Sequence, residues 1–159
     1  MIATIIIQTI NDDSHQKCLE LVKKQTVSTT IFLVERENWV LTLNDVLMDI
    51  KDFKYVVFLD GSRDEPFPHM IECMVEHLEK SPPVFSGCYS DYYIDDFYCF
   101  LPSFDLSKKY LKITSVHKNS DNLLLDERST KTIEQFWNNP KFLITHYPYP
   151  LYIFREKKE

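Results

Sequence analysis

The sequence predicts an α/β fold built around a parallel β-sheet. Apolar runs rich in β-branched and aromatic residues occupy 3–10, 29–35 and 55–60, and stretches with helical spacing of apolar residues separate them. Strands that alternate with helices pair in parallel through right-handed crossovers. At 159 residues the chain is long enough for one ordinary domain, which we expect to span residues 1–159.

Three helices are expected in the first half, at 11–25, 41–50 and 69–80. The last has the clearest pattern, because its glutamates lie on one face and its apolar residues on the other. The side chains expected to face the core from this helix are Met70, Ile71, Met74, Val75 and Leu78.

The second half is less regular, and we expect the following elements: strands at 82–93, 96–102 and 111–118, and a helix at 129–139. The strand at 96–102 would pair antiparallel with the one before it. Residues 141–155 would form one or two further strands, because Pro148 and Pro150 interrupt the run and proline cannot donate to a sheet ladder.

Composition excludes several classes of protein. Loops that cradle phosphates need several glycines, and this chain has only Gly61 and Gly87, which excludes P-loop and Rossmann sites. The net charge is −6, and the only basic stretch is the short run at 155–158, so no nucleic-acid partner is expected.

The location of the protein is expected to be cytoplasmic. The N-terminal apolar run lacks a basic segment before it and is too short for a signal peptide or a membrane span. The four cysteines have no CxxC spacing, so we expect free thiols in a reducing compartment.

Polar residues lie at the carboxyl ends of the first three predicted strands. They are Asn11, Glu35 and Asp60, and the last begins an acidic turn that continues to Asp64 and Glu65. Ligands of open parallel sheets gather at the carboxyl ends of the strands, so these side chains mark a candidate site. Two interpretations of the turn stay open: a metal or phosphate site, or solvated acids that lie near a helix N-terminus.

Six segments, taken in order, resemble the family 2 glycosyltransferases. These segments are "ATIIIQTIN", "KKQTVSTTIFLVER", "YVVFLDGSRDEPFP", "VFSGCYSDYYIDD", "LLLDERSTKTIEQFW" and "THYPYPLYIFR". The third resembles the strand that carries the family's DxD motif, and the last resembles its closing pattern HIPEPLYYYR. The resemblance implies the GT-A fold, a three-layer α/β sandwich with a mainly parallel central sheet. It divides the chain into a donor-binding half, 1–96, and a shortened acceptor-side half, 97–159.

The resemblance also implies a function, the transfer of a sugar from a nucleotide-sugar donor of the UDP-sugar class. Asn11, Glu35 and Asp60 would bind the donor. Asp60 and Asp64 would hold a divalent cation, Mg²⁺ or Mn²⁺, which bridges the diphosphate. Glu134 would act as the general base that deprotonates the acceptor hydroxyl.

The motifs depart from the family at their chemically important positions. Ser62 or Arg63 stands where the second DxD acid belongs, and Gln135 stands where the base usually lies. The segment between the second and third strands is also short. The alternative hypothesis is therefore a non-catalytic GT-A-like binding or assembly module without a cofactor. Such a module would join a protein partner or a second copy of itself, for example as a bacteriophage virion component.

Two further groups of polar residues stand out along the chain. Asp91, Asp95 and Asp96 are expected to form a solvated loop, with a displaced cation site as the alternative. His117 and His146 are expected to be polar or core histidines without a catalytic role.

Overall fold

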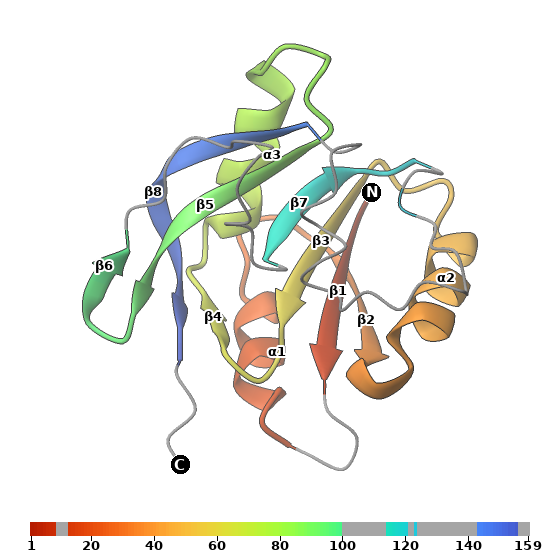
Figure 1. The fold of residues 1–159 in the computed structure, drawn as a ribbon, viewed down its shortest axis with the longest axis horizontal. Helices are drawn as coiled ribbons and strands as arrows, with labels where there is room; N and C mark the ends of the chain where they lie inside the picture. Colours follow the sequence, from red (N-terminus) through yellow and green to blue (C-terminus); the bar gives the residue numbers. More distant parts are fainter. Residues whose placement is uncertain (9–12, 100–113, 121–122, 124–142, 156–159) are drawn as a thin grey trace.

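In the part of the chain that is described, a central eight-stranded sheet organises the structure (Figure 1). The computed structural model describes residues 1–8, 13–99, 114–120, 123 and 143–155. The strand order is β2-β1-β3-β7-β5-β8-β4, and β6 pairs with β5 beside this path. Strands β2, β1 and β3 pair in parallel, as do β5 and β8, whereas β7 runs antiparallel between β3 and β5. This confirms the predicted α/β class with a mainly parallel sheet.

The first half of the chain follows the predicted alternation of strands and helices. Its elements are β1 (Ile2–Gln8), α1 (Gln16–Lys23), β2 (Thr30–Glu35), the short 3₁₀ helix η1 (Arg36–Asn38), α2 (Trp39–Asp49), β3 (Tyr55–Asp60), β4 (Asp64–Pro66) and α3 (Met70–Lys80). The strand expected at 55–60 is confirmed at both ends. Strand β4 was not predicted, because a three-residue segment that contains two acids and a proline has the composition of a turn.

The second half contains β5 (Gly87–Ile94), β6 (Phe97–Cys99), β7 (Ser115–Lys118) and β8 (Ile144–Phe154). The antiparallel pairing of β6 with β5 is confirmed. The two prolines do not divide β8, because its pairing with β5 shifts register on either side of Asp91 and so accommodates them. The helix expected at 129–139 lies outside the described residues.

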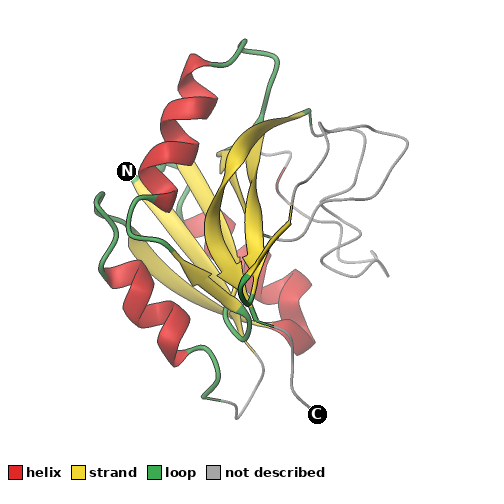
Figure 2. Ribbon diagram, turned by 90° about the vertical axis from the view of Figure 1, so that its left-hand side faces the viewer, coloured by secondary structure: helices red, strands yellow, loops and turns green. Residues whose placement is uncertain are grey.

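Helices cover both faces of the sheet, which makes three layers (Figure 2). Alternate residues of β3 point to opposite sides: Val57 and Leu59 pack in the cluster with α1 and α3, and Val56 and Phe58 pack in the cluster with α2. All six residues of β3 are buried, as expected for a central strand of a parallel sheet. The predicted inward face of α3 is confirmed for Met70, Ile71, Met74 and Leu78.

Gly61 lets the turn after β3 lie directly against β1. Its N–H donates to the carbonyl of Ile7 at 2.8 Å. A Cβ at this position would lie 2.6 Å from Cγ2 of Ile6 and 2.9 Å from Cβ of His15. The absence of a side chain therefore brings the acidic turn down onto the end of β1. No helix in the described part of the chain is long and apolar enough to cross a membrane.

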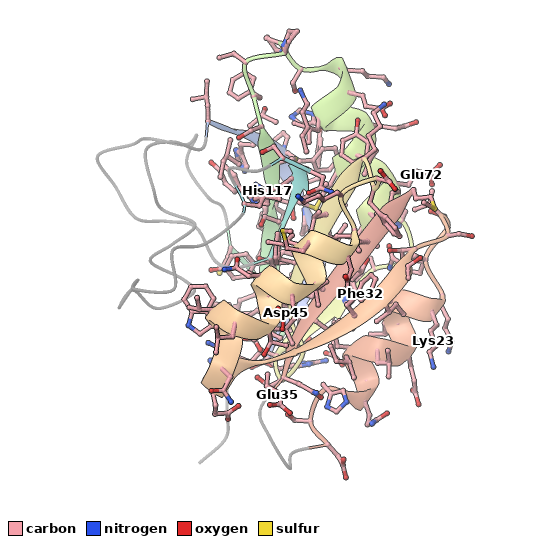
Figure 3. All side chains as sticks on the ribbon, turned by 90° about the vertical axis from the view of Figure 1, so that its right-hand side faces the viewer. Lys23, Phe32, Glu35, Asp45, Glu72 and His117 are labelled. Atoms are coloured by element: carbon pink, nitrogen blue, oxygen red, sulfur yellow. The ribbon has the colours of Figure 1, made fainter. Side chains whose placement is uncertain are left out.

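His117 is a fully buried histidine in the middle of the sheet (Figure 3). Its Nε2 lies 3.0 Å from the hydroxyl of Ser115, and its ring packs edge-on against Phe58. Burial lowers the pKa of His117 to about 3, so the ring is neutral in the folded protein. This agrees with the expected core role.

The buried neutral histidine predicts a specific loss of stability in acid. The unfolded chain gains a proton at His117 below about pH 6.5, and the folded chain does not until much lower pH, so stability present above pH 6.5 is lost as the pH falls. In denaturant titrations, the advantage of the wild type over His117→Gln should shrink by about 2 kcal/mol between about pH 7.5 and about pH 5. A constant advantage across this range would contradict the assignment.

Candidate functional site

Two of the predicted strand-end residues lie at the same end of the sheet, where the parallel strands have their carboxyl ends. We call this end the carboxyl edge of the sheet. Glu35, the last residue of β2, pairs with Gln8 at the end of β1, and Asp60 at the end of β3 pairs with Ile7 on the other side of β1. Figure 3 shows Glu35 at the carboxyl end of its strand. The sequence-based expectation that Glu35 and Asp60 lie at a common edge is therefore confirmed. Asn11 and Glu134 lie outside the described residues, and their proposed roles stay predictions.

Asp60 uses both carboxylate oxygens within the protein. Its Oδ1 accepts hydrogen bonds from the backbone N–H of Ser62 at 3.1 Å and from the hydroxyl of Ser62 at 2.8 Å. Its Oδ2 accepts one from Nη2 of Arg36 at 3.2 Å. The side chain of Asp60 is 13% exposed and that of Arg36 is 34% exposed, so the ion pair lies at the surface end of a buried strand.

Arg36 is the functional candidate that the sequence did not reveal. It begins η1 directly after β2, and its side chain crosses the end of β1 to reach Asp60. Neighbouring strands lie about 4.8 Å apart, so the ends of β2 and β3 are roughly 10 Å apart, a gap that an extended arginine spans. The sequence "VER" places a basic residue directly after β2, but only the strand order shows that this arginine faces Asp60.

Asp64 lies beneath this surface pair. The residue is 1% exposed, and its Oδ2 accepts hydrogen bonds from the backbone N–H of Asp60 at 2.8 Å and from the hydroxyl of Thr114. These contacts tie the start of β4 to the end of β3 and to the residue before β7. The carboxylate of Asp64 therefore holds the turn together.

Glu65 is paired with two cations. Lys17 contacts one carboxylate oxygen at 3.0 Å, and Arg155 contacts the other and also reaches Asp95 at 3.1 Å. Burial acts to raise the pKa of Glu65, but the hydrogen bonds from Lys17 and Arg155 outweigh it and lower the pKa overall. Arg63, the residue that aligns with the second DxD acid if the turn carries an insertion, stacks over the ring of Phe154 at 5.2 Å.

These contacts bear on the expected divalent cation. No three His, Cys, Asp or Glu side chains converge as a potential metal site in the part of the chain that is described. Asp60 and Asp64, the two expected ligands, are engaged with Arg36, Ser62 and Thr114. This donor set fits Mg²⁺ or Mn²⁺ poorly, because both cations prefer several oxygen ligands directed at one point.

A second polar cluster lies on β5 and β8. Asp91 is buried, and its two oxygens meet Nε2 of His146 at 2.7 Å and the hydroxyl of Tyr98 at 2.9 Å. The ring of His146 stacks on Tyr89 with a centroid separation of 4.8 Å. The expectation that Asp91 belongs to a solvated loop was therefore wrong. Its strand position gives it hydrogen-bonding partners that local sequence could not predict.

Comparison with known proteins supports the fold. No family model and no curated protein matches the sequence. Among solved structures, residues 1–349 of TarS from S. aureus match with a TM-score of 0.71 and 10% identity over 96% of this chain and 59% of that chain. The same TarS segment in complex with UDP-GlcNAc matches with a TM-score of 0.69 and 10% identity, over 99% of this chain and 59% of that one. The A197 protein from STIV matches with a TM-score of 0.59 and 13% identity, over 93% of this chain and 82% of that one.

At these identities the matches establish the fold alone. The chain spans just under three fifths of the length of the TarS segment that it matches. Together with the three layers and the mainly parallel sheet, the comparison shows that the chain has the fold of GT-A-type nucleotide-sugar transferases.

The hydrogen bond from Thr114 to Asp64 is expected to stabilise the turn beneath the site. Thr114→Val keeps the shape of the side chain but removes a buried donor to a carboxylate, so the free energy of unfolding should fall by about 1–2 kcal/mol. The matched control is Thr26→Val, which removes an exposed hydrogen bond to Glu72 and should cost less than about 0.5 kcal/mol. Equal losses in chemical denaturation would contradict the structural role of Asp64.

Proposed function

We propose that this chain binds a nucleotide sugar of the UDP-sugar class and is a short relative of the family 2 glycosyltransferases. The observation that carries the proposal is the meeting of Glu35, Arg36 and Asp60 at one carboxyl edge of a GT-A-type sheet. Ligands of open α/β sheets bind at such edges. The structure of TarS residues 1–349 in complex with UDP-GlcNAc shares this fold, which supports the ligand class.

Each candidate residue has a distinct proposed task. Asn11 and Glu35 would hold the uracil and ribose, as the family resemblance implies. Asp60, fixed by Ser62 and Arg36, would set the position of the diphosphate. Asp64 would support Asp60 from below, because its carboxylate accepts a hydrogen bond from the backbone N–H of Asp60. No step is assigned to a cation here, because the described contacts of Asp60 and Asp64 fit one poorly.

Sugar transfer would need a base that accepts the proton of the acceptor hydroxyl. Glu134 is the proposed base, since Gln135 beside it cannot accept a proton. The division into a donor half at 1–96 and an acceptor half at 97–159 likewise stays a prediction. Because the chain covers only part of the TarS segment, complete transfer activity is a proposal separate from donor binding.

The second candidate function is a non-catalytic binding or assembly module. The engagement of Asp60, Asp64 and Glu65 with neighbouring side chains favours it, since these acids already serve the protein's own structure. Phe97 and Tyr149 are 77% and 62% exposed and suit a contact with a protein partner or a second copy. A197 from STIV, a viral protein, shares the fold, and the virion role stays a proposal.

Ligand titration tests the donor site. UDP, UDP-glucose, UDP-galactose and UDP-GlcNAc should each bind saturably in calorimetry, and ADP and GDP should bind more weakly. Asp60→Ala should lower the affinity at least about tenfold, because it removes the group that orients Arg36. The control Asp95→Ala removes an exposed carboxylate that pairs with Arg155, and it should leave the affinity within about threefold.

The same titration separates the two candidate functions. Binding of a UDP-sugar, followed by transfer of its sugar to water or to an added acceptor with release of UDP, would support the transferase if Glu134→Gln lowers that release at least about a hundredfold. Binding without turnover would support the binding module. Absence of binding by any of the uridine ligands would contradict the proposed donor site.

A further inference from the structure

We infer that this edge of the sheet binds the diphosphate of its ligand without a divalent cation, with Arg36 supplying the positive charge. The inference rests on the proposed function for the identity of the ligand. The positive group that pairs with the diphosphate can be inferred from the contacts of Asp60, Asp64 and Arg36.

The oxygen atoms that a cation would need are largely engaged within the protein. Both oxygens of Asp60 already accept hydrogen bonds, Oδ1 from Ser62 and Oδ2 from Arg36. Asp64 is almost completely buried and accepts hydrogen bonds from the backbone N–H of Asp60 and from Thr114. Coordination through either oxygen of Asp60, or through Oδ2 of Asp64, would therefore break contacts that hold the β3–β4 turn.

The positive charge of Arg36 disfavours a divalent cation at Asp60. The guanidinium of Arg36 lies 3.2 Å from Oδ2 of Asp60, and an ion bound to that oxygen would be its immediate neighbour. A divalent cation and a guanidinium at such a separation repel each other strongly, most of all near a partly buried surface. Arg36 thus occupies the position beside Asp60 that a divalent cation would otherwise take.

The guanidinium of Arg36 is suited to bind a phosphate. A guanidinium is charged at all physiological pH values, and its planar set of five N–H donors can bond a carboxylate and a phosphate together. Asp60 orients the group, and 34% of the side chain remains accessible to a ligand. Hydrogen bonds from arginine to phosphate are among the strong, charge-assisted ones.

Basic side chains also pair with the acid that follows Asp64 in the turn. Glu65 contacts Lys17 and Arg155, and Arg155 also contacts Asp95. Asp60 and Glu65 are thus each paired with basic side chains, whereas the hydrogen bonds described for Asp64 come from neutral donors to its Oδ2.

The experiment is calorimetric titration of the full chain with UDP, in buffer with excess EDTA and in buffer with Mn²⁺. The two affinities should agree within about threefold. Arg36→Ala should weaken UDP binding at least about tenfold in EDTA, and Arg36→Lys should recover part of the loss. Arg155→Ala is the matched control, because Arg155 is also an arginine that pairs with acids, Glu65 and Asp95. Its affinity for UDP should stay within about threefold of the wild type.

The outcomes separate this inference from the proposed function. UDP binding that requires Mn²⁺, or that Mn²⁺ strengthens at least about tenfold, would overturn the inference while the donor site stands. Arg36→Ala and Arg36→Lys proteins that melt like the wild type yet bind UDP normally would also overturn it. Absence of UDP binding in both buffers would overturn the proposed function and this inference together.

Discussion

The burial of β3 is the constraint on which the described architecture depends. All six of its residues are buried, it pairs with β1 on one side and β7 on the other, and its two faces pack against both helical layers. A strand held in this way fixes the position of its last residue, Asp60. The turn that follows is pressed against β1 at Gly61, so the carboxylate of Asp60 has little freedom to move.

The carboxyl end of β3 is polar, and two of the three acids in and after it are paired with basic side chains. Asp60 faces Arg36, Asp64 supports the backbone of Asp60, and Glu65 meets Lys17 and Arg155. In the family that the sequence resembles, acids at this edge hold a cation that in turn holds the diphosphate. Here an arginine stands beside the acid, and it could meet the diphosphate directly. On this proposal, a sheet with the GT-A-type fold would bind its ligand through an arginine instead of a cation.

Strands and helices with strong local patterns could be predicted from the sequence. The run at 55–60 matched β3 at both ends, and the inward face of α3 followed from its spacing. The features that were missed depend on contacts between distant segments. Strand β4 exists because it pairs with β8, and the pairing of Arg36 with Asp60 requires β2 and β3 to flank β1. Similarly, the hydrogen bond between Asp91 and His146 requires β8 to lie beside β5.

The central claim is that Arg36, and not a metal ion, meets the ligand at the end of β3. Its most direct test is a crystal structure of the chain grown with UDP and Mn²⁺, with anomalous scattering used to locate manganese. We expect the diphosphate to bond to the guanidinium of Arg36, with no anomalous peak at coordination distance from Asp60. A manganese peak bound by Asp60, with Arg36 displaced from the carboxylate, would contradict the claim.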